Sequence, residues 1–326
     1  MKTLKFNSCF ADKLNKFVDL KRLSCTEYQS QIKLLKYFDK FLIDEHFNER
    51  YLTQEIIERY LAGISNLHPR TIYNRFSVIR LFCHYLSQFD PCCYIPGQLL
   101  KTVKSSSLRI PYIYTKTEIR NLLDKASKLS PRKPFYSYTY YTLFGLLYTT
   151  GIRIGEALAL NIEDFHQDSK LLHIRKGKFH KARWVPVSVS TYMILKKYIN
   201  IRQQINKISP DSPFFINQEY NRLHHNSVAQ TFYLLLKRCN FHISKDYRPR
   251  IHDIRHAFAV HRLVKWYQDG KDVNALLPAL ATYMGHVNIS SSQVYLQATS
   301  EMLEQGNQRF FKYFRENIKN NGGYHE

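Results

Sequence analysis

The stretch Thr150-Gly-Ile-Arg-Ile-Gly-Glu-Ala-Leu158 places one arginine, Arg153, between a glycine turn and the start of a helix. Aromatic and apolar residues fill 135–150, which predicts a buried helix that ends at Gly151. A guanidinium beside the free N–H groups of a helix start is a good seat for a phosphate. The alternative is a surface arginine that follows the end of a helix.

After this stretch the hydrophobic period changes from that of a helix to that of a strand. Residues 171–175 and 183–187 predict two strands, and the basic segment 176–181 joins them as a hairpin. A lysine on such a turn can reach into a cleft and donate a proton. A charged hairpin tip without chemistry is the far commoner case.

The sequence His252-Asp-Ile-Arg255 places an imidazole and a guanidinium three residues apart. On a helix these positions share a face, so both side chains point the same way. By composition, roughly one such pair is expected in a chain like this one, so the match is weak by itself. His180 and Arg183 form a second pair, which we attribute to chance.

A fourth feature is Gly285-His286, followed by Tyr295 nine residues after the histidine. Composition predicts this combination in only a few of about a hundred chains. The alternative is a core tyrosine that lies beside Val294 on an amphipathic helix.

In this order the four features resemble the tyrosine recombinases, the family of phage integrases and chromosome-dimer resolvases. Residues 150–158 are similar to the first arginine box, 252–258 to the second, and 284–295 to the closing box. The motifs cover about residues 113–300. For residues 1–105 the resemblance rests only on helical character and position, which are similar to those of the core-binding domain.

The resemblance implies a role for each matching side chain. Arg153 and Arg255 would grip the scissile phosphate, His252 would handle protons, and His286 would hydrogen-bond the phosphate. Tyr295 would be the nucleophile.

A hairpin lysine would protonate the leaving 5′ oxygen. Lys178 keeps the family's distance to Val185-Pro186, and Lys176 stays open as the alternative. Glu156 would support the site from behind the phosphate-binding groups.

The segment 266–281 departs from the family pattern, because it is longer than the usual spacing between the second and closing boxes. In this it resembles integrases of mobile elements more than compact resolvases. The departure bears on the subfamily and leaves the chemistry unchanged.

The expected fold is mainly α with a small β-sheet. We expect an all-helical core-binding domain over 1–105, a linker over 106–112, and an α+β catalytic domain over 113–326 with a helical tail. Apolar stripes predict helices near 26–41, 52–61 and after Pro69, and Thr115 with Glu118 predicts a capping box. Further helices are predicted at about 190–204, 227–239, 252–267, 272–284 and 290–318.

The net charge of +22 with a pI near 9.7 points to a polyanionic partner. Double-stranded DNA is favoured, with membrane phospholipid as the alternative. The candidate DNA contacts outside the catalytic set are basic residues of the helical lobe and the linker: Arg70, Arg75, Arg80, Lys101, Lys104 and Arg109. A solvated helix face is the competing interpretation of the first three.

The six cysteines show no zinc-ligand spacing, and we expect neither a metal nor another cofactor. No signal peptide or membrane span is predicted, which favours the bacterial cytoplasm and association with the nucleoid. Residues 299–318 form an amphipathic tail that would link protomers as a dimer or tetramer on DNA, or pack on its own domain.

The predicted function is site-specific DNA recombination, by integration or excision of a mobile element, through a 3′-phosphotyrosyl intermediate without metal or ATP. A type IB topoisomerase and a non-catalytic DNA-binding regulator are the alternatives.

Overall fold

The chain divides into two compact units, Met1–Ile110 and Pro111–Glu326, in a computed structural model. The structure describes residues 6–23, 28–97, 111–130, 134–175, 182–241 and 249–285. Whether the units carry the core-binding and catalytic roles stays a prediction at this point.

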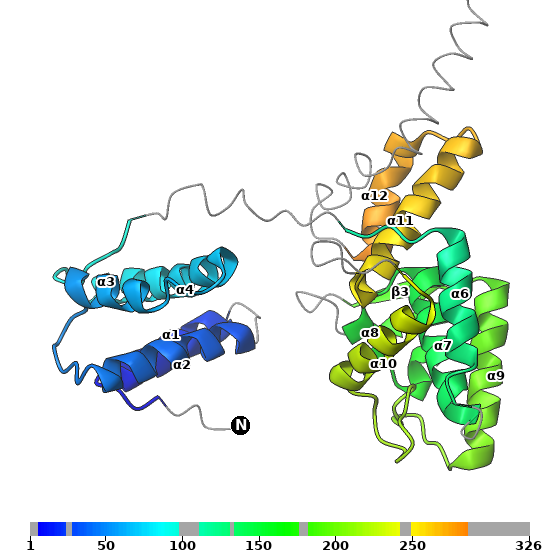
Figure 1. The fold of residues 1–326 in the computed structure, drawn as a ribbon, viewed down its shortest axis with the longest axis horizontal. Helices are drawn as coiled ribbons and strands as arrows, with labels where there is room; N and C mark the ends of the chain where they lie inside the picture. The colour runs from blue at the N-terminus through cyan, green and yellow to red at the C-terminus, as the bar shows by residue number, and fades with distance from the viewer. Residues whose placement is uncertain are drawn as a thin grey trace, which may run out of the picture. The chain divides into compact units, whose positions relative to one another are not determined.

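The N-terminal unit is built from helices α1 (Ala11–Leu23), α2 (Gln29–Asp44), α3 (Gln54–Gly63) and α4 (Pro69–Ser87) (Figure 1). Helix α4 packs against α1 and α2. The predicted stripe of α2 is confirmed, because Ile32, Leu35, Phe38 and Leu42 are all buried. Helix α1 was not predicted separately.

Local signals start two of these helices. The Thr53 hydroxyl accepts from the N–H of Ile56, which caps α3. Pro69 opens α4 as predicted, since its missing N–H would have no partner in a first turn.

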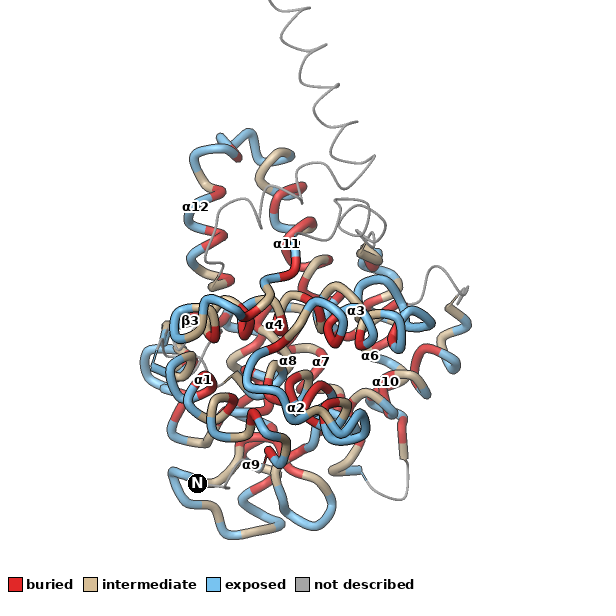
Figure 2. Tube along the Cα trace, turned by 90° about the vertical axis from the view of Figure 1, so that its left-hand side faces the viewer, coloured by how far each residue is buried: buried red, intermediate tan, exposed pale blue. Residues whose placement is uncertain are grey.

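The C-terminal unit contains most of the helices, with α7 near its centre. Its elements are α6 (Lys116–Ser127), α7 (Pro134–Thr150), α8 (Ile154–Ala159), η1 (Ile162–Asp164), β1 (Phe165–His166), β2 (Leu171–Ile174), β3 (Arg183–Pro186), α9 (Val189–Ile205), α10 (His225–Arg238), α11 (Ile251–Gln268) and α12 (Val273–Met284). Helix α7 packs against α6, α9 and α11, which explains its apolar and aromatic composition. Figure 2 colours the buried stretches red.

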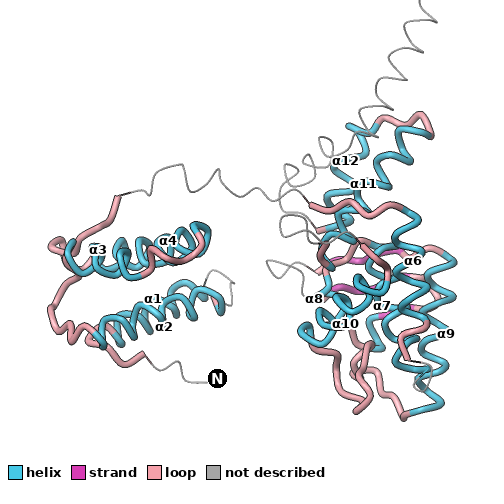
Figure 3. The backbone as a smooth tube through the Cα atoms, viewed as in Figure 1, coloured by secondary structure: helices cyan, strands magenta, loops and turns pink. Residues whose placement is uncertain are grey.

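The strands form one small antiparallel sheet in the order β1-β2-β3 (Figure 3). The predicted pairing of β2 with β3 is confirmed, with Leu172 opposite Val185 and both side chains buried. The two-residue strand β1 was not predicted. The fold class predicted from the sequence, mainly α with a small sheet, is therefore confirmed.

The predicted helices at 190–204, 227–239, 252–267 and 272–284 correspond to α9, α10, α11 and α12, with boundaries within two residues. The predicted helix at 290–318 lies outside the described residues. Among the helices that are described, none is long and apolar enough to cross a membrane.

Candidate active site

Gly151 ends helix α7 and sets the direction of the chain into α8. Its N–H donates to the carbonyl of Leu147, and its φ of 62° lies in the left-handed region that favours glycine. A β-carbon here would lie 2.3 Å from Cδ1 of Phe258 on α11. The predicted helix end is therefore confirmed, and the turn also needs glycine for close packing.

Arg153 stands at the N-cap of α8, with its side chain partly exposed. Its Nη1 donates to Oε1 of Glu156 at 2.7 Å, and its backbone N–H donates to Oε2 at 2.9 Å. Its Nη2 donates to the carbonyl of Gly285 at 2.9 Å. The first arginine box is thus linked to the end of α12.

Arg255 lies on α11 and is 2% exposed. Its Nη1 donates to the carbonyl of Gly151 at 2.5 Å, and its Nη2 donates to the carbonyl of Met284 at 2.7 Å. Arg153 and Arg255 therefore bind neighbouring carbonyls at the end of one helix. The structure brings these two predicted residues together, although they come from separate segments of the chain.

A third guanidinium, that of Arg183 on β3, joins the same helix end. Its Nε donates to the carbonyl of Tyr283 at 3.0 Å, and its Nη1 and Nη2 donate to the two oxygens of Glu156 at 3.0 and 2.8 Å. This role was not predicted from the sequence. The only available signal was an arginine at the start of the strand that follows the basic hairpin.

Three consecutive carbonyls at the end of α12, those of residues 283 and 284 and of the cap residue 285, thus each accept from a different arginine. The last carbonyls of a helix lack intrahelical partners and carry partial negative charge, so cations stabilise them. Gly285 closes the helix with φ 69°. The residue that follows this clamped end is His286.

Glu156 holds the negative charge between Arg153 and Arg183. Burial alone would raise its pKa, but the hydrogen bonds and charge of Arg183 and Arg153 outweigh burial and lower the pKa to about 2. The carboxylate is therefore ionised at neutral pH and fixes both guanidinium groups.

His252 is the second residue of α11, one turn before Arg255, and its ring lies 4.9 Å from that of His256, centroid to centroid. His252 is an exposed residue, but desolvation by the surrounding protein, and then the charge of Arg255, lower its pKa below 6.5. For His256, desolvation and the neighbouring His252 lower the pKa to about 4. Both rings are therefore mainly neutral at pH 7, so His252 is able to accept a proton.

Several predicted site residues lie outside the described part of the chain. These are Lys176, Lys178, His286 and Tyr295 of the catalytic set, and Lys101, Lys104 and Arg109 of the linker. Their roles stay predictions.

The three predicted DNA contacts of the N-terminal unit differ in their surroundings. Arg70 is exposed at the start of α4. The Arg75 guanidinium lies 4.3 Å from the ring centroid of Tyr37, and Nε of Arg80 donates to the carbonyl of Pro96. Arg70 also lies over an aromatic ring, with its Cζ 5.8 Å from the ring centroid of Tyr73, and it is the exposed one of the three. All three DNA contacts stay predictions.

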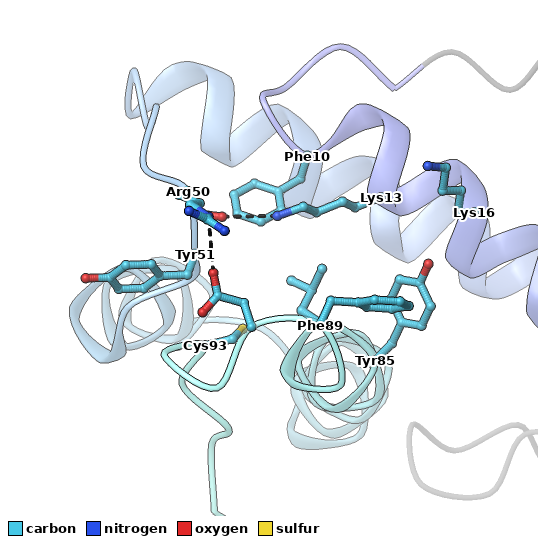
Figure 4. Close-up of a pocket in the computed structure, with 10 residues that line it drawn as sticks. Phe10, Lys13, Lys16, Arg50, Tyr51, Tyr85, Phe89 and Cys93 are labelled. Carbon is cyan, nitrogen blue, oxygen red and sulfur yellow. Dashed lines mark hydrogen bonds and ion pairs between the residues drawn. The ribbon is translucent and has the colours of Figure 1, made fainter.

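The N-terminal unit also has a cavity of about 260 Å³ lined by aromatic and basic side chains. Figure 4 shows Arg50 beside Phe10, and Nζ of Lys13 donates to the backbone carbonyl of Arg50 at 3.1 Å. None of the residues that line this cavity belongs to the predicted catalytic set. Within the described ranges, no group of three or more His, Cys, Asp or Glu side chains is arranged to hold a metal ion.

The family model of the phage integrase family matches residues 113–302. The chain is 33% identical over 307 residues to a putative integrase/recombinase, y4rB, of Sinorhizobium fredii, covering 93% of this chain and 97% of that protein. The chain belongs to the phage integrase family. It is also 30% identical over 251 residues to the tyrosine recombinase XerD of Oceanobacillus iheyensis, covering 75% of this chain and 77% of that protein.

Solved structures share the fold of this family member. An integrase of the transposon Tn1549 in complex with transposon right end DNA matches with a TM-score of 0.67 and 15% identity, covering 93% of this chain and 98% of that one. The XerH recombinase bound to its difH substrate matches with a TM-score of 0.64 and 20% identity, covering 86% and 78%. The resemblance inferred from the four sequence motifs is confirmed at the level of the family and the fold.

Proposed function

We propose that this chain is a site-specific DNA recombinase that cleaves and rejoins DNA through a 3′-phosphotyrosyl intermediate. The observation that carries the proposal is the convergence of Arg153 and Arg255 on adjacent carbonyls at the end of α12. This convergence sets two permanently charged, planar donors at the end of α12, and Tyr295 follows that end in the sequence. Membership of the phage integrase family supports the same activity.

In the proposed reaction the Tyr295 oxygen attacks the scissile phosphorus, and the bond from phosphorus to the 5′ oxygen breaks. His252 accepts the phenol proton, because desolvation and the charge of Arg255 keep it neutral at pH 7. Arg153 and Arg255 stabilise the charge that grows on the non-bridging oxygens, and His286 hydrogen-bonds the same phosphate. Lys178, with Lys176 as the alternative, gives a proton to the leaving 5′ oxygen.

The reverse reaction rejoins the DNA. A different 5′ hydroxyl attacks the phosphotyrosyl phosphorus and releases Tyr295, so the bond energy is conserved. On this basis neither ATP nor a metal ion is required, because the two guanidinium groups supply the positive charge. We expect cleavage to proceed in the presence of EDTA and without nucleotide.

The partners we propose are double-stranded DNA and further copies of this chain, as a dimer or tetramer on DNA. The net charge of +22 supports a DNA partner. The transposon integrase and XerH were solved with DNA, and a structure of lambda integrase is a tetramer bound to a Holliday junction. The segment 299–318 is the candidate link between protomers.

Integration or excision of a mobile element is the process we favour, and it places the protein in the bacterial cytoplasm beside the nucleoid. The long spacing between the second and closing boxes supports this assignment. The putative integrase/recombinase of Sinorhizobium is similar over nearly its whole length.

A suicide-substrate assay tests the proposal. Nicked duplexes tiled across the DNA that flanks the gene are incubated with the wild type and with Tyr295→Phe, and covalent protein–DNA adducts are separated on denaturing gels. We expect an adduct on a small set of duplexes with the wild type and none with Tyr295→Phe. Adducts on all DNA, with relaxation of supercoils, would instead identify a topoisomerase. No adduct on any duplex would favour a DNA-binding regulator.

A further inference from the structure

We propose that Arg183 is a positioning residue for the cleavage reaction, which ties the Glu156–Arg153 pair to the end of α12. This inference rests on the proposed function and adds a residue to its machinery. Arg183 does not touch the phosphate in this proposal. It acts through Glu156, Arg153 and the carbonyl of Tyr283.

The Arg183 guanidinium hydrogen-bonds two separate elements at once. Nη1 and Nη2 bind the two oxygens of one carboxylate, and Nε binds a backbone carbonyl on a different element. Every nitrogen of the guanidinium thus donates to protein, and its side chain is only 12% exposed. This arrangement suits a group that fixes the positions of Glu156 and of the end of α12 relative to each other.

Glu156 depends on Arg183 for half of the hydrogen bonds that reach it from described residues. Each carboxylate oxygen accepts one bond from Arg183 and one from Arg153. A buried carboxylate that lacks hydrogen-bond partners raises the free energy of the folded state. When two of its four bonds are lost, the Glu156 carboxylate is therefore expected to turn toward other partners, and its orientation becomes less defined. Arg153 would lose its fixed geometry as a consequence.

A close approach at Gly285 gives an independent observation. A β-carbon on Gly285 would lie 2.9 Å from Nη1 and 3.0 Å from Cζ of Arg183. The guanidinium therefore packs directly against the backbone of Gly285, whose carbonyl binds Arg153. Arg183 thus sets where the backbone stands immediately before His286.

A second contact joins the same two elements. The Tyr283 hydroxyl donates to the carbonyl of Pro186 at 3.2 Å, so β3 and α12 are linked at both ends of the strand.

Lysine in place of Arg183 keeps the charge but cannot bind two carboxylate oxygens and a carbonyl in one plane.

The experiment compares wild type, Arg183→Lys and a control, Arg222→Lys, on the nicked duplex that gives most adduct with the wild type. Arg222 also binds backbone carbonyls at a helix end, those of Leu158 and Leu160 at the end of α8. Among the described residues its side-chain hydrogen bonds go to these carbonyls and to Asn161, and none goes to α12. Single-turnover cleavage at saturating protein gives a rate constant and an amplitude, and titration gives the DNA dissociation constant.

We expect Arg183→Lys to lower the rate constant by about 10- to 100-fold, because a small misplacement of a catalytic group has effects of that size. The amplitude and the dissociation constant should stay within about threefold, since folding and DNA affinity are retained. If Arg222→Lys reduces cleavage at all, the amplitude should decrease while the rate constant stays that of the wild type. A merely structural role of Arg183 predicts the same pattern as the control and would overturn the inference.

If Arg183→Lys does not fold, the paired variant Arg183→Gln with Glu156→Gln removes both buried charges together and serves the same comparison. A rate constant equal to that of the wild type in this pair overturns the inference. Absence of any adduct with the wild type overturns the proposed function itself and, with it, the role of Arg183.

Discussion

The guanidinium of Arg153 donates to the carbonyl oxygen of Gly285 at 2.9 Å, across 132 residues of sequence. The first arginine box and the start of the closing box are therefore in direct contact. Arg153, the predicted phosphate-binding residue, thus contacts the last described residue before His286. Changes on either side of this bond should consequently affect the same reaction step.

Loss of either predicted phosphate-binding arginine should slow cleavage. We expect Arg153→Lys and Arg255→Lys each to lower the single-turnover rate constant by about 100- to 1000-fold, as for the loss of a transition-state donor. Arg238→Lys is the control, because Arg238 is exposed and donates to the carbonyl of Leu129. Rate constants within about threefold of the wild type would contradict the assignment.

Cleavage should depend on pH through His252. Desolvation and the charge of Arg255 lower its pKa below 6.5, so the neutral, proton-accepting form prevails at pH 7. The rate constant should fall as pH drops below 6.5, as the histidine becomes protonated. His252→Gln should lower the rate at pH 7.5 by about 100-fold or more and remove this acidic limb. The exposed His225 provides the matched control, His225→Gln, whose acidic limb should be that of the wild type.

The stability of the C-terminal unit should depend on Glu156 in acid. Its pKa is lowered from 4.5 to about 2, so its ionised form stabilises the fold above pH 4.5, and this contribution is lost as pH falls through about 2. The difference in unfolding free energy between wild type and Glu156→Gln should therefore shrink by about 3 kcal/mol between pH 5 and pH 2.

Urea unfolding followed by tryptophan fluorescence measures this difference, because both tryptophans, Trp184 and Trp266, belong to the C-terminal unit. The control is Glu163→Gln, since Glu163 forms a largely exposed pair with Arg175. If the difference in unfolding free energy between wild type and Glu156→Gln stays constant down to pH 2, protonation of Glu156 does not contribute to the loss of stability in acid.

Gly151→Ala should destabilise the C-terminal unit by more than about 2 kcal/mol, since the new methyl group would meet Phe258 and the residue must keep a positive φ. Gly145→Ala, in the interior of α7 with open space around it, should change stability by less than about 1 kcal/mol. The same fluorescence-detected urea unfolding compares the two. Equal effects would mean that the turn after α7 is not restricted to glycine.

The sequence predicted those features that depend on nearby residues. The capping box of Thr115 and Glu118 forms as expected, because both of its hydrogen bonds join residues three apart. The β2–β3 hairpin and the end of α7 at Gly151 were predictable for the same reason.

The role of Arg183 was not predictable in this way. Its carbonyl partner on Tyr283 is 100 residues away, and nothing in the local pattern around β3 indicates that contact. Helix α1 and the two-residue strand β1 were also missed, since neither has a strong periodic pattern and both are fixed by packing on neighbouring elements.

Of the candidate site, Arg153, Glu156 and Arg255 were named from family-like motifs. In the structure Arg153 binds Glu156, and Arg255 binds the carbonyls of Gly151 and Met284, while their roles in catalysis stay predictions. The placement of Lys178, His286 and Tyr295 stays a prediction, because these residues lie outside the described ranges.

DNA affinity should respond to Arg70 in a salt-dependent way. Arg70→Ala should reduce the slope of log K against log salt by about 0.9, as expected when one phosphate contact is removed. Arg59→Ala is the control, because Arg59 pairs with Glu45 and Glu55 on the surface of the same unit. Filter binding of double-stranded DNA at several salt concentrations gives the slopes. An unchanged slope for Arg70→Ala would assign this residue to a solvated helix face.

The three arginines that hold the end of α12 have a consequence for incomplete copies of this gene. A product that stops before Gly285 would lack the carbonyl that receives Arg153, in addition to the candidate nucleophile. Arg153 would keep its hydrogen bonds to Glu156, and Arg255 would keep those to Gly151 and Met284. Such a shortened protein should therefore keep most of its phosphate-binding groups in place and still be unable to cleave DNA.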